Sequence, residues 1–351
     1  MQAVAVFRDG SVRTVEKPRP DPAPGEALVR TLRVGVDGTD RRIAAGELGE
    51  FPDGEDHLVL GHEAVGVVED PNGTALSAGD VVVPTVRRPP ADGTNEYFER
   101  GEPDYAPPGE FVERGIFGAH GVMAEYFTDA EEYLVPVPDA LAEYGFLVEP
   151  ASVAEKALEA AFASRSAFEW RRESALVLGT GSLGLTALAR LAFGDEFDRT
   201  YCLGRRDRSD PAVEFVERVG ATYVDSREVP LPDVPDAHEP VDLVYESTGH
   251  VPHAVETVEA LAPNGVGALQ GVPGSDAFEI DGGRLHEDLV LGNRALVGNV
   301  NSRPEHFAAA AEAFQSYPEW TFEALVSGTY RPSEASDALA DDGPKAVVSF
   351  E

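Results

Sequence analysis

The chain has 351 residues, 42% of them hydrophobic, so it is long enough for two domains with hydrophobic cores of their own. It carries 63 acidic and 28 basic residues, and this net charge of −35 disfavours binding to nucleic acid or to an anionic membrane, because both require a positive face. No apolar run reaches the roughly 18 residues that span a bilayer, and the N-terminus has no signal-peptide pattern, so we expect a cytoplasmic protein.

The acidic residues are spread along the whole chain and do not form a tail. Two explanations stay open: a surface that binds a basic partner, and an enzyme that works in a high-salt cytosol. Self-repulsion of this size destabilises a fold in dilute salt. Salt at about 1 M shortens the Debye length to about 3 Å and screens the repulsion. We therefore favour a halophilic enzyme over an acidic scaffold.

Residues 1–140 are predicted to be rich in short β-strands. Hydrophobic runs between Gly, Pro and Asp turns fit strands at residues 3–7, 26–36, 58–68, 80–86 and 133–138. Residues 87–117 are polar and rich in Pro and Gly, which predicts a long lobe or lid, and loops of that length are usually functional. The one cysteine, Cys202, excludes an intramolecular disulfide and any thiolate-rich zinc site.

From about residue 150 the pattern changes to alternating helices and strands. Helical segments are expected at residues 153–165, 183–193, 210–220, 253–262 and 306–316. Strand-like runs lie at residues 175–178, 200–204, 221–225, 242–248, 265–272, 294–300 and 346–351. This alternation implies βαβ units, and therefore an α/β fold with a doubly wound parallel sheet.

A glycine-rich motif marks the first turn of that sheet. Residues 179–184, which are Gly179, Thr180, Gly181, Ser182, Leu183 and Gly184, match G-x-G-x-x-G. The motif follows a predicted strand and opens a predicted helix, and this context indicates a dinucleotide site. The first glycine permits a tight turn, the second lets the backbone approach the pyrophosphate, and the third allows close packing of helix against strand. A tight turn in another α/β fold is the alternative.

The residues after the second strand point to the identity of the dinucleotide. An NAD site usually has an acid there that holds the ribose 2′-hydroxyl. This chain has Gly204, Arg205, Arg206 and Asp207. Two guanidinium groups favour a 2′-phosphate, which Arg can bind in bidentate fashion. We expect NADP as the cofactor and, because of Asp207, NAD as a secondary one; a solvated charge cluster is the alternative.

A candidate metal site begins in the run LVLGHEAVGVV, residues 58–68, with His62 and Glu63. A lone histidine in an apolar run is more often a core residue than a ligand. Asp37 at the end of one strand run and Glu149 at the start of the helical part offer further carboxylates. Zinc accepts imidazole and carboxylate, and a catalytic zinc leaves one position open. Spacing in sequence does not show that these residues meet.

Three motifs together resemble a known family. The segments GHEAVGVV, VGVDGTD and GTGSLG are similar to those of the zinc-dependent medium-chain dehydrogenase/reductase family, and the likeness covers essentially the whole chain. The segments GRR, EFVERGIFGAHG and LVGNVNS most closely resemble archaeal, in particular haloarchaeal, glucose 1-dehydrogenases. The resemblance implies a GroES-like catalytic domain over residues 1–150 and 303–351, and an NAD(P)-binding Rossmann domain over residues 151–302.

The resemblance also implies one catalytic zinc ion. Asp37 takes the place of the family's usual cysteine, and His62 and Glu149 are the other two ligands. Glu63 matches a catalytic glutamate that enters the coordination sphere transiently. The family's structural zinc needs four closely spaced cysteines, whereas residues 87–105 contain none, so we expect no structural zinc.

The implied reaction is oxidation of the C1 hydroxyl of D-glucose to gluconolactone, with hydride transfer to NADP. Thr39 resembles a proton relay that contacts the substrate, although a turn-capping role fits equally well. Glu113, Glu149 and Asn301 are implied to contact the sugar, and Asn301 also to reach the nicotinamide.

Further implications concern the cofactor and the assembly. Thr248 and Asn299, each at a strand end, are candidate cofactor contacts, and a homodimer is expected, with a homotetramer as the alternative. Other functions stay open: a dehydrogenase for another aldose or a simple alcohol, a zinc-free reductase of the same fold, or a non-catalytic NADP-binding or sensing protein.

Replacing Arg205 and Arg206 by alanine should raise KM for NADP far more than KM for NAD, because only NADP carries the 2′-phosphate. Loss of two charge-assisted contacts predicts a rise of roughly a hundredfold for NADP. Initial-rate kinetics with each cofactor measures the difference. Equal effects on the two cofactors would remove both arginines from the 2′-phosphate site.

Overall fold

The computed structural model of the protein describes residues 1–91 and 93–351 and divides them into two compact units. The first unit comprises Met1–Ser152, Asn301–Ser316 and Val326–Glu351, and the second comprises Val153–Val300 and Tyr317–Leu325. The first boundary falls inside helix α3 (Val148–Ser164). Residues 317–325, which we expected in the catalytic domain, belong to the second unit.

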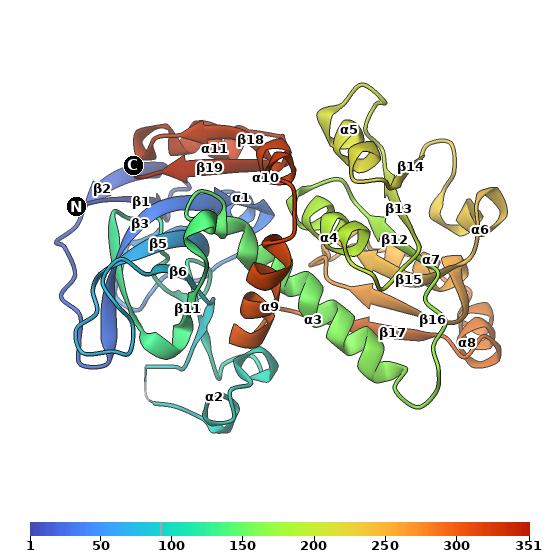
Figure 1. The fold of residues 1–351 in the computed structure, drawn as a ribbon, viewed down its shortest axis with the longest axis horizontal. Helices are drawn as coiled ribbons and strands as arrows, with labels where there is room; N and C mark the ends of the chain where they lie inside the picture. The colour runs from blue at the N-terminus through green and yellow to red at the C-terminus, as the bar shows by residue number, and fades with distance from the viewer. Residues whose placement is uncertain (92) are drawn as a thin grey trace. The chain divides into compact units, whose positions relative to one another are not determined.

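The first unit is built around a seven-stranded sheet whose order is β11-β6-β5-β3-β19-β18, with β10 also paired to β3 (Figure 1). Its strands are β3 (Glu26–Val36), β5 (Glu63–Asp70), β6 (Val81–Pro84), β10 (Tyr126–Ala130), β11 (Leu134–Pro136), β18 (Val326–Tyr330) and β19 (Lys345–Ser349). All pairs are antiparallel except β18 with β19. Buried Val, Leu and Ala side chains of these strands supply much of the core of the unit, as their alternating hydrophobic pattern predicts.

Two smaller sheets and four helices complete the first unit. The smaller sheets are formed by β1 (Gln2–Phe7), β2 (Val12–Glu16) and β4 (His57–Val59), and by β7 (Arg87–Arg88), β8 (Val112–Arg114) and β9 (Gly118–Ala119). The helices are α1 (Gly38–Ala44), α2 (Glu96–Glu99), α9 (Pro304–Phe314) and α11 (Ala335–Ala340). Among its described residues, the predicted lobe at residues 87–117 therefore contains the short strands β7 and β8, the helical turn α2 and a 3-10 turn at Pro103–Tyr105.

The long strand β3 brings distant parts of the chain to one end of the large sheet. Gly35 pairs with Glu63 of β5, and the neighbouring Val36 pairs with Ala346 of β19. A Cβ atom on Gly35 would lie 2.4 Å from Oε2 of Glu63 and 3.3 Å from Cδ of Lys345. Glycine is therefore needed where these two charged side chains cross the strand.

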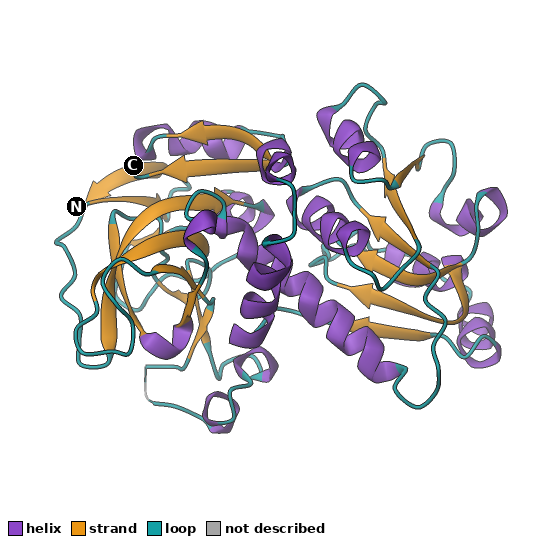
Figure 2. Ribbon diagram, viewed as in Figure 1, coloured by secondary structure: helices purple, strands orange, loops and turns teal. Residues whose placement is uncertain are grey.

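The second unit is a parallel sheet of six strands in the order β14-β13-β12-β15-β16-β17, flanked by helices (Figures 1 and 2). The strands are β12 (Ser174–Leu178), β13 (Arg199–Gly204), β14 (Thr222–Asp225), β15 (Val241–Glu246), β16 (Leu261–Leu269) and β17 (Ala295–Gly298). The helices, besides α3, are α4 (Ser182–Phe193), α5 (Pro211–Arg218), α6 (Val234–Ala237), α7 (His253–Ala260), α8 (Gly282–Leu291) and α10 (Glu319–Leu325). If the six strands are numbered along the chain, their order across the sheet is 3-2-1-4-5-6, which is the Rossmann arrangement. The predicted doubly wound sheet is confirmed.

Every residue of β12 and β15 is buried, as expected for inner strands that are covered on both faces.

Over residues 1–91 and 93–351, no helix combines the length and apolar composition needed to cross a membrane.

Candidate active site

Asp37 and His62 face each other at one end of the large sheet in the first unit. Asp37 is the N-cap of α1, and its Oδ1 accepts hydrogen bonds from the backbone N–H groups of Thr39 (2.8 Å) and Asp40 (3.0 Å). Its other oxygen, Oδ2, lies 3.7 Å from Nε2 of His62. Capping occupies one carboxylate oxygen and directs the other at the histidine, so that both side chains can contact one ion.

Glu63 and Glu149 add carboxylates to this pair. One polar atom each of Asp37, His62 and Glu63 lies within 4.8 Å of the others. Glu149, buried in the first turn of α3, is not one of these three. Burial lowers the pKa of His62, but the surrounding carboxylates, Asp37 foremost and Glu149 among them, outweigh it and raise that pKa well above its ordinary value. The structure thus brings Asp37 and Glu63 next to His62, and Glu149 lies near enough for its charge to act on the imidazole.

Two further charged residues at this site were not predicted. Asp40, fully buried, accepts hydrogen bonds from the backbone N–H of Asp37 (3.2 Å) and of Gly61 (3.3 Å), which ties α1 to the loop before His62. Lys345 at the start of β19 forms a buried ion pair with Glu63. The spacing Asp-x-x-Asp of a capping box could have indicated Asp40. Lys345 is one of only three lysines in the chain. It lies 282 residues from Glu63, so no local pattern could have indicated the pair.

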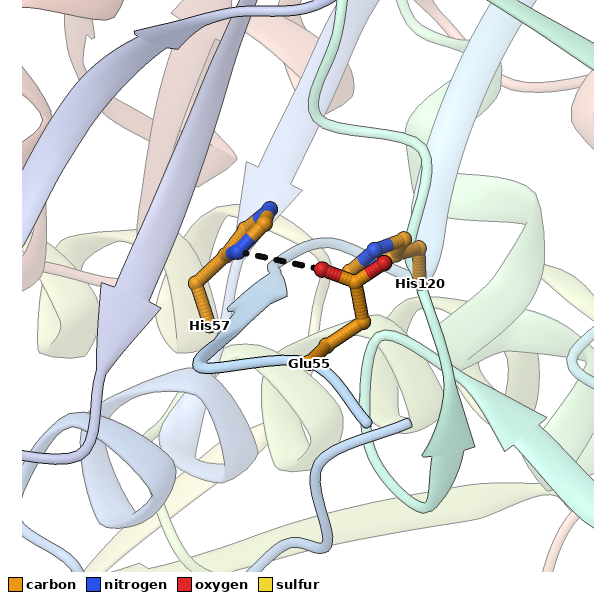
Figure 3. Close-up of side chains that lie close together, drawn as sticks. All are labelled: Glu55, His57 and His120. Carbon is orange, nitrogen blue, oxygen red and sulfur yellow. Dashed lines mark ion pairs between the residues drawn. The ribbon is translucent and has the colours of Figure 1, made fainter. Parts of the chain in front are cut away.

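A second group with metal-ligand chemistry consists of Glu55, His57 and His120 (Figure 3). Nδ1 of His57 lies 3.6 Å from Oε2 of Glu55, which is the ion pair drawn in the figure. The ammonium of Lys17, however, lies 3.0 Å from Nε2 of His57 and 3.1 Å from Nε2 of His120. The chain's own cation already occupies the space between the two imidazoles, so the buried group around His62 is the better metal candidate.

The glycine-rich turn of the second unit has the geometry of a dinucleotide site. Gly179 has a backbone φ of +111°, which residues with a side chain rarely adopt. A Cβ atom on Gly184 would lie 2.3 Å from the carbonyl oxygen of Gly179. Gly181 is the N-cap of α4, and a Cβ there would meet no atom within 4 Å. Two glycines are needed for the turn itself, and the third leaves the helix N-terminus open to an anion.

The predicted 2′-phosphate residues lie at the end of β13. Arg205 is exposed and forms no ion pair with the residues that the structure describes, whereas Arg206 contacts Asp210 at 3.3 Å. The carboxylate of Asp207 forms an ion pair with Arg227 at 2.9 Å, so its negative charge is matched by an arginine. Arg227, which follows β14, was not among the residues predicted from the sequence.

The other predicted cofactor residues adjoin a cavity at the carboxyl ends of β15, β16 and β17. This cavity has a volume of about 470 Å³, and Glu246, Gly271 and Asn299 are among its lining residues. Thr248 is held by hydrogen bonds to Glu246 and to Nδ1 of His253 (2.9 Å). In open α/β sheets, ligands bind outside the carboxyl ends of the strands, which is where this cavity lies.

The residues predicted to meet the sugar lie in the first unit. Thr39 is half-buried in the first turn of α1, and its hydroxyl forms no hydrogen bond with a described residue. Glu113 is buried on β8, and Nδ2 of Asn301 lies 3.4 Å from its Oε1. Thr39 is not a capping side chain, because Asp37 performs the capping.

Two family models match the chain. The Alcohol dehydrogenase GroES-like domain matches residues 23–139, and the Glucose dehydrogenase C-terminus matches residues 142–350. The chain belongs to the glucose dehydrogenase family. It is 61% identical over its whole length to Glucose 1-dehydrogenase of Haloferax mediterranei, with 99% of that protein covered, and 60% identical to Glucose 1-dehydrogenase 2 of Haloterrigena turkmenica, with all of both chains covered.

A solved structure is also similar to this glucose dehydrogenase family member. It is the glucose dehydrogenase of Haloferax mediterranei in complex with NADP, Zn and gluconolactone, which is 59% identical, with a TM-score of 0.97 and coverage of 100% of this chain and 99% of that chain. The predicted likeness to the zinc-dependent medium-chain dehydrogenases and to haloarchaeal glucose 1-dehydrogenases is confirmed.

The charges at the His62 site of this family member suit a divalent cation. Burial raises the pKa of Asp40 to about 7 and that of Glu149 to about 8. Burial also raises the pKa of Glu63, although the charge of Lys345 opposes it. Four carboxyl groups thus surround one histidine and one lysine, and protons are held where the negative charges would repel one another. A divalent cation can replace those protons.

Zinc affinity of the metal-free protein should therefore rise with pH up to at least pH 8, by about tenfold per pH unit for each proton displaced, because protons on Glu149 and on His62 both compete with the ion. The sign follows from the raised pKa: the carboxyl group is protonated below about 8 and ionised above it. Competition with a chromophoric chelator measures the affinity. Glu149→Gln should lower the slope below pH 8 by about tenfold in affinity per pH unit, and an unchanged slope in that variant would exclude Glu149 as one of the competing groups.

Proposed function

We propose that the protein oxidises the C1 hydroxyl of D-glucose to gluconolactone and transfers the hydride to NADP, with NAD as a secondary acceptor. The observation that carries the proposal is the pair of half-buried Asp37 and buried His62, with one aspartate oxygen fixed by helix capping and the other directed at the imidazole. The high identity to a glucose dehydrogenase solved with NADP, Zn and gluconolactone supports the same reaction.

One catalytic zinc would be held by Oδ2 of Asp37, Nε2 of His62 and the carboxylate of Glu149. Bound zinc would act as a Lewis acid that lowers the pKa of the sugar hydroxyl. Lys345 holds the Glu63 carboxylate beside these ligands through the buried ion pair, and its charge favours the ionised form of Glu63 against the effect of burial. The chain has no cysteine between residues 87 and 105, and we infer that it holds no structural zinc.

Around the sugar, this chain's own residues bind, orient and move protons. The hydroxyl of Thr39, on the helical turn capped by Asp37, can relay the proton that leaves the C1 hydroxyl, accepting it while its own proton passes to water. The carboxylate of Glu113 and the side-chain amide of Asn301 can hydrogen-bond ring hydroxyls and fix the orientation of the pyranose. Such polar contacts distinguish a sugar from a simple alcohol.

In the second unit, the open N-terminus of α4 would bind the pyrophosphate of NADP at Gly181. Arg205 and Arg206 would bind the 2′-phosphate, and Thr248 and Asn299 would contact the remainder of the cofactor beside the cavity. The dispersed negative charge and the haloarchaeal relatives support action in a high-salt cytosol.

The test is the initial rate of NADP reduction in multimolar KCl with glucose, other aldoses and simple alcohols, before and after chelation. We expect turnover with glucose to be lost on chelation and restored by zinc. Turnover that survives complete metal removal would contradict the zinc mechanism. NADP binding without turnover on any substrate would favour a sensing protein.

Matched histidine variants locate the metal. His62→Gln should abolish both stoichiometric zinc and turnover, whereas His57→Gln should retain both, because Lys17 already occupies the position between His57 and His120. The opposite pattern would move the catalytic metal to the site near His57.

We further propose a homodimer formed through the β17 edge of the second unit. Among the residues that the structure describes, β17 pairs only with β16, and one edge of the sheet is left open. Nearby α8 carries exposed Val290 and Leu291, the latter 77% exposed. An open sheet edge beside exposed apolar side chains is typical of a surface that assembly covers, and this supports the proposed dimer.

Leu291→Glu should therefore convert the dimer to a monomer, because it places a charge in the covered surface. Light scattering in multimolar KCl measures the mass, and Phe168→Glu is the control at an exposed apolar residue elsewhere in the same unit. A wild-type monomer would contradict the proposal, as would an unchanged dimer in the Leu291 variant. A wild-type tetramer that dissociates to dimers on Leu291→Glu would place a dimer–dimer contact there instead.

A further inference from the structure

Arg87 is a buried arginine that sequence analysis did not single out. It lies on β7 directly opposite Glu113 of β8. Arg87 is only 4% exposed, and Glu113 is 6% exposed. Nε of Arg87 donates a hydrogen bond to Oε1 of Glu113 at 2.9 Å. Its Cζ atom also lies 3.7 Å from the centroid of the Phe111 ring. A guanidinium in such surroundings has a fixed orientation.

The same guanidinium holds the segment 95–111. The three buried residues of this segment are Pro103, Asp104 and Ala106, and Nη1 of Arg87 lies within hydrogen-bond distance of the carbonyl oxygen of each, at 3.2, 3.0 and 3.4 Å. The helical turn α2 in this segment buries none of its residues. The segment also lacks cysteine. Its attachment to the rest of the first unit therefore depends on one side chain to an unusual degree.

The contact with Arg87 leaves Glu113 prepared for a ligand. Oε1 accepts from Nε of Arg87, and Nδ2 of Asn301 lies 3.4 Å from the same oxygen. Oε2 has no hydrogen-bond partner in the described part of the chain. Asn301 adopts φ +58°, a left-handed conformation that asparagine tolerates, and this places its amide beside the carboxylate. One oxygen is thus fixed and the other remains available.

We propose that Arg87 is a positioning residue for the sugar: it fixes Glu113 so that Oε2 accepts a hydroxyl hydrogen bond, and it anchors segment 95–111 beside that carboxylate. This inference rests on the proposed function, in which Glu113 contacts the sugar. An arginine can do both because its planar group presents five donors in fixed directions. A lysine ammonium in its place can pair with Glu113 but cannot reach the three carbonyls at the same time.

The first test compares Arg87→Met with Arg100→Met. Arg100 is an exposed arginine of the same segment, paired with Glu96 and Glu102, and is the matched control. Arg87→Met should raise KM for glucose by about tenfold or more, as expected for removing one partner of a buried charge pair, and change KM for NADP by less than about twofold. It should also become sensitive to limited proteolysis within residues 95–111. Arg100→Met should do neither.

Deoxy sugars separate positioning from general loosening. If Oε2 of Glu113 accepts one sugar hydroxyl, removal of that hydroxyl from the 2-, 3- or 6-position should raise KM in the wild type but much less in Arg87→Met. Unchanged discrimination among these sugars in Arg87→Met would overturn the proposal. If the methionine variant does not fold, Arg87→Lys provides the same comparison. Its KM for glucose should rise less than in Arg87→Met, but residues 95–111 should still be more sensitive to proteolysis than in the wild type.

A double-mutant cycle with Glu113→Gln tests whether Arg87 acts through Glu113. In the Glu113→Gln background, Arg87→Met should add less than about threefold to KM for glucose, because residues that act as a unit are not additive. Fully additive effects would show that Arg87 acts elsewhere. If Glu113→Gln itself leaves KM for sugar unchanged, the assignment of Glu113 fails. If only Arg87→Met is without effect, the positioning role alone fails.

Discussion

Lys345 and Glu63 are buried together, 0% and 2% exposed, and this ion pair constrains much of the first unit. A charge that has lost its water must be matched by a partner with good geometry, or the fold loses several kcal/mol (about 3–5). The match is possible only because Gly35 of β3 leaves space between the two side chains. The pair thereby holds β5 and β19 in register on either side of β3, and the residue before Glu63 is His62.

Helix capping performs a second task at the same end of the sheet. The reciprocal capping by Asp37 and Asp40 stabilises a short helix, α1, and uses one oxygen of Asp37 in doing so. Asp40 also accepts a hydrogen bond from the backbone N–H of Gly61, which ties the helix to the loop before His62. Local interactions that serve folding therefore set the geometry of a carboxylate and an imidazole that can share an ion. Rigid support of this kind is what a metal site requires.

Basic residues are scarce in this chain, and several of them occupy positions where a single cation organises many groups. Arg87 joins a strand, a carboxylate and three carbonyls, Lys17 lies between two imidazoles, and Lys345 neutralises a buried glutamate. Acidic residues on the surface, in contrast, need no such partners when salt screens them. The excess of acidic residues is thus a property of the surface, whereas these few basic residues hold together groups in the interior.

The sequence by itself determined the parallel sheet and the nucleotide turn, because hydrophobic period, glycine spacing and the helix start are local signals. It also indicated His62 and Asp37 as candidates, through residue type and resemblance. Only the tertiary structure decided that Asp40 and Lys345 complete their surroundings, and that Arg87 holds Glu113. Those contacts join residues up to 282 positions apart, as in the pair of Lys345 with Glu63. Strand pairing, which brings such residues together, depends on long-range register, and no local pattern encodes it.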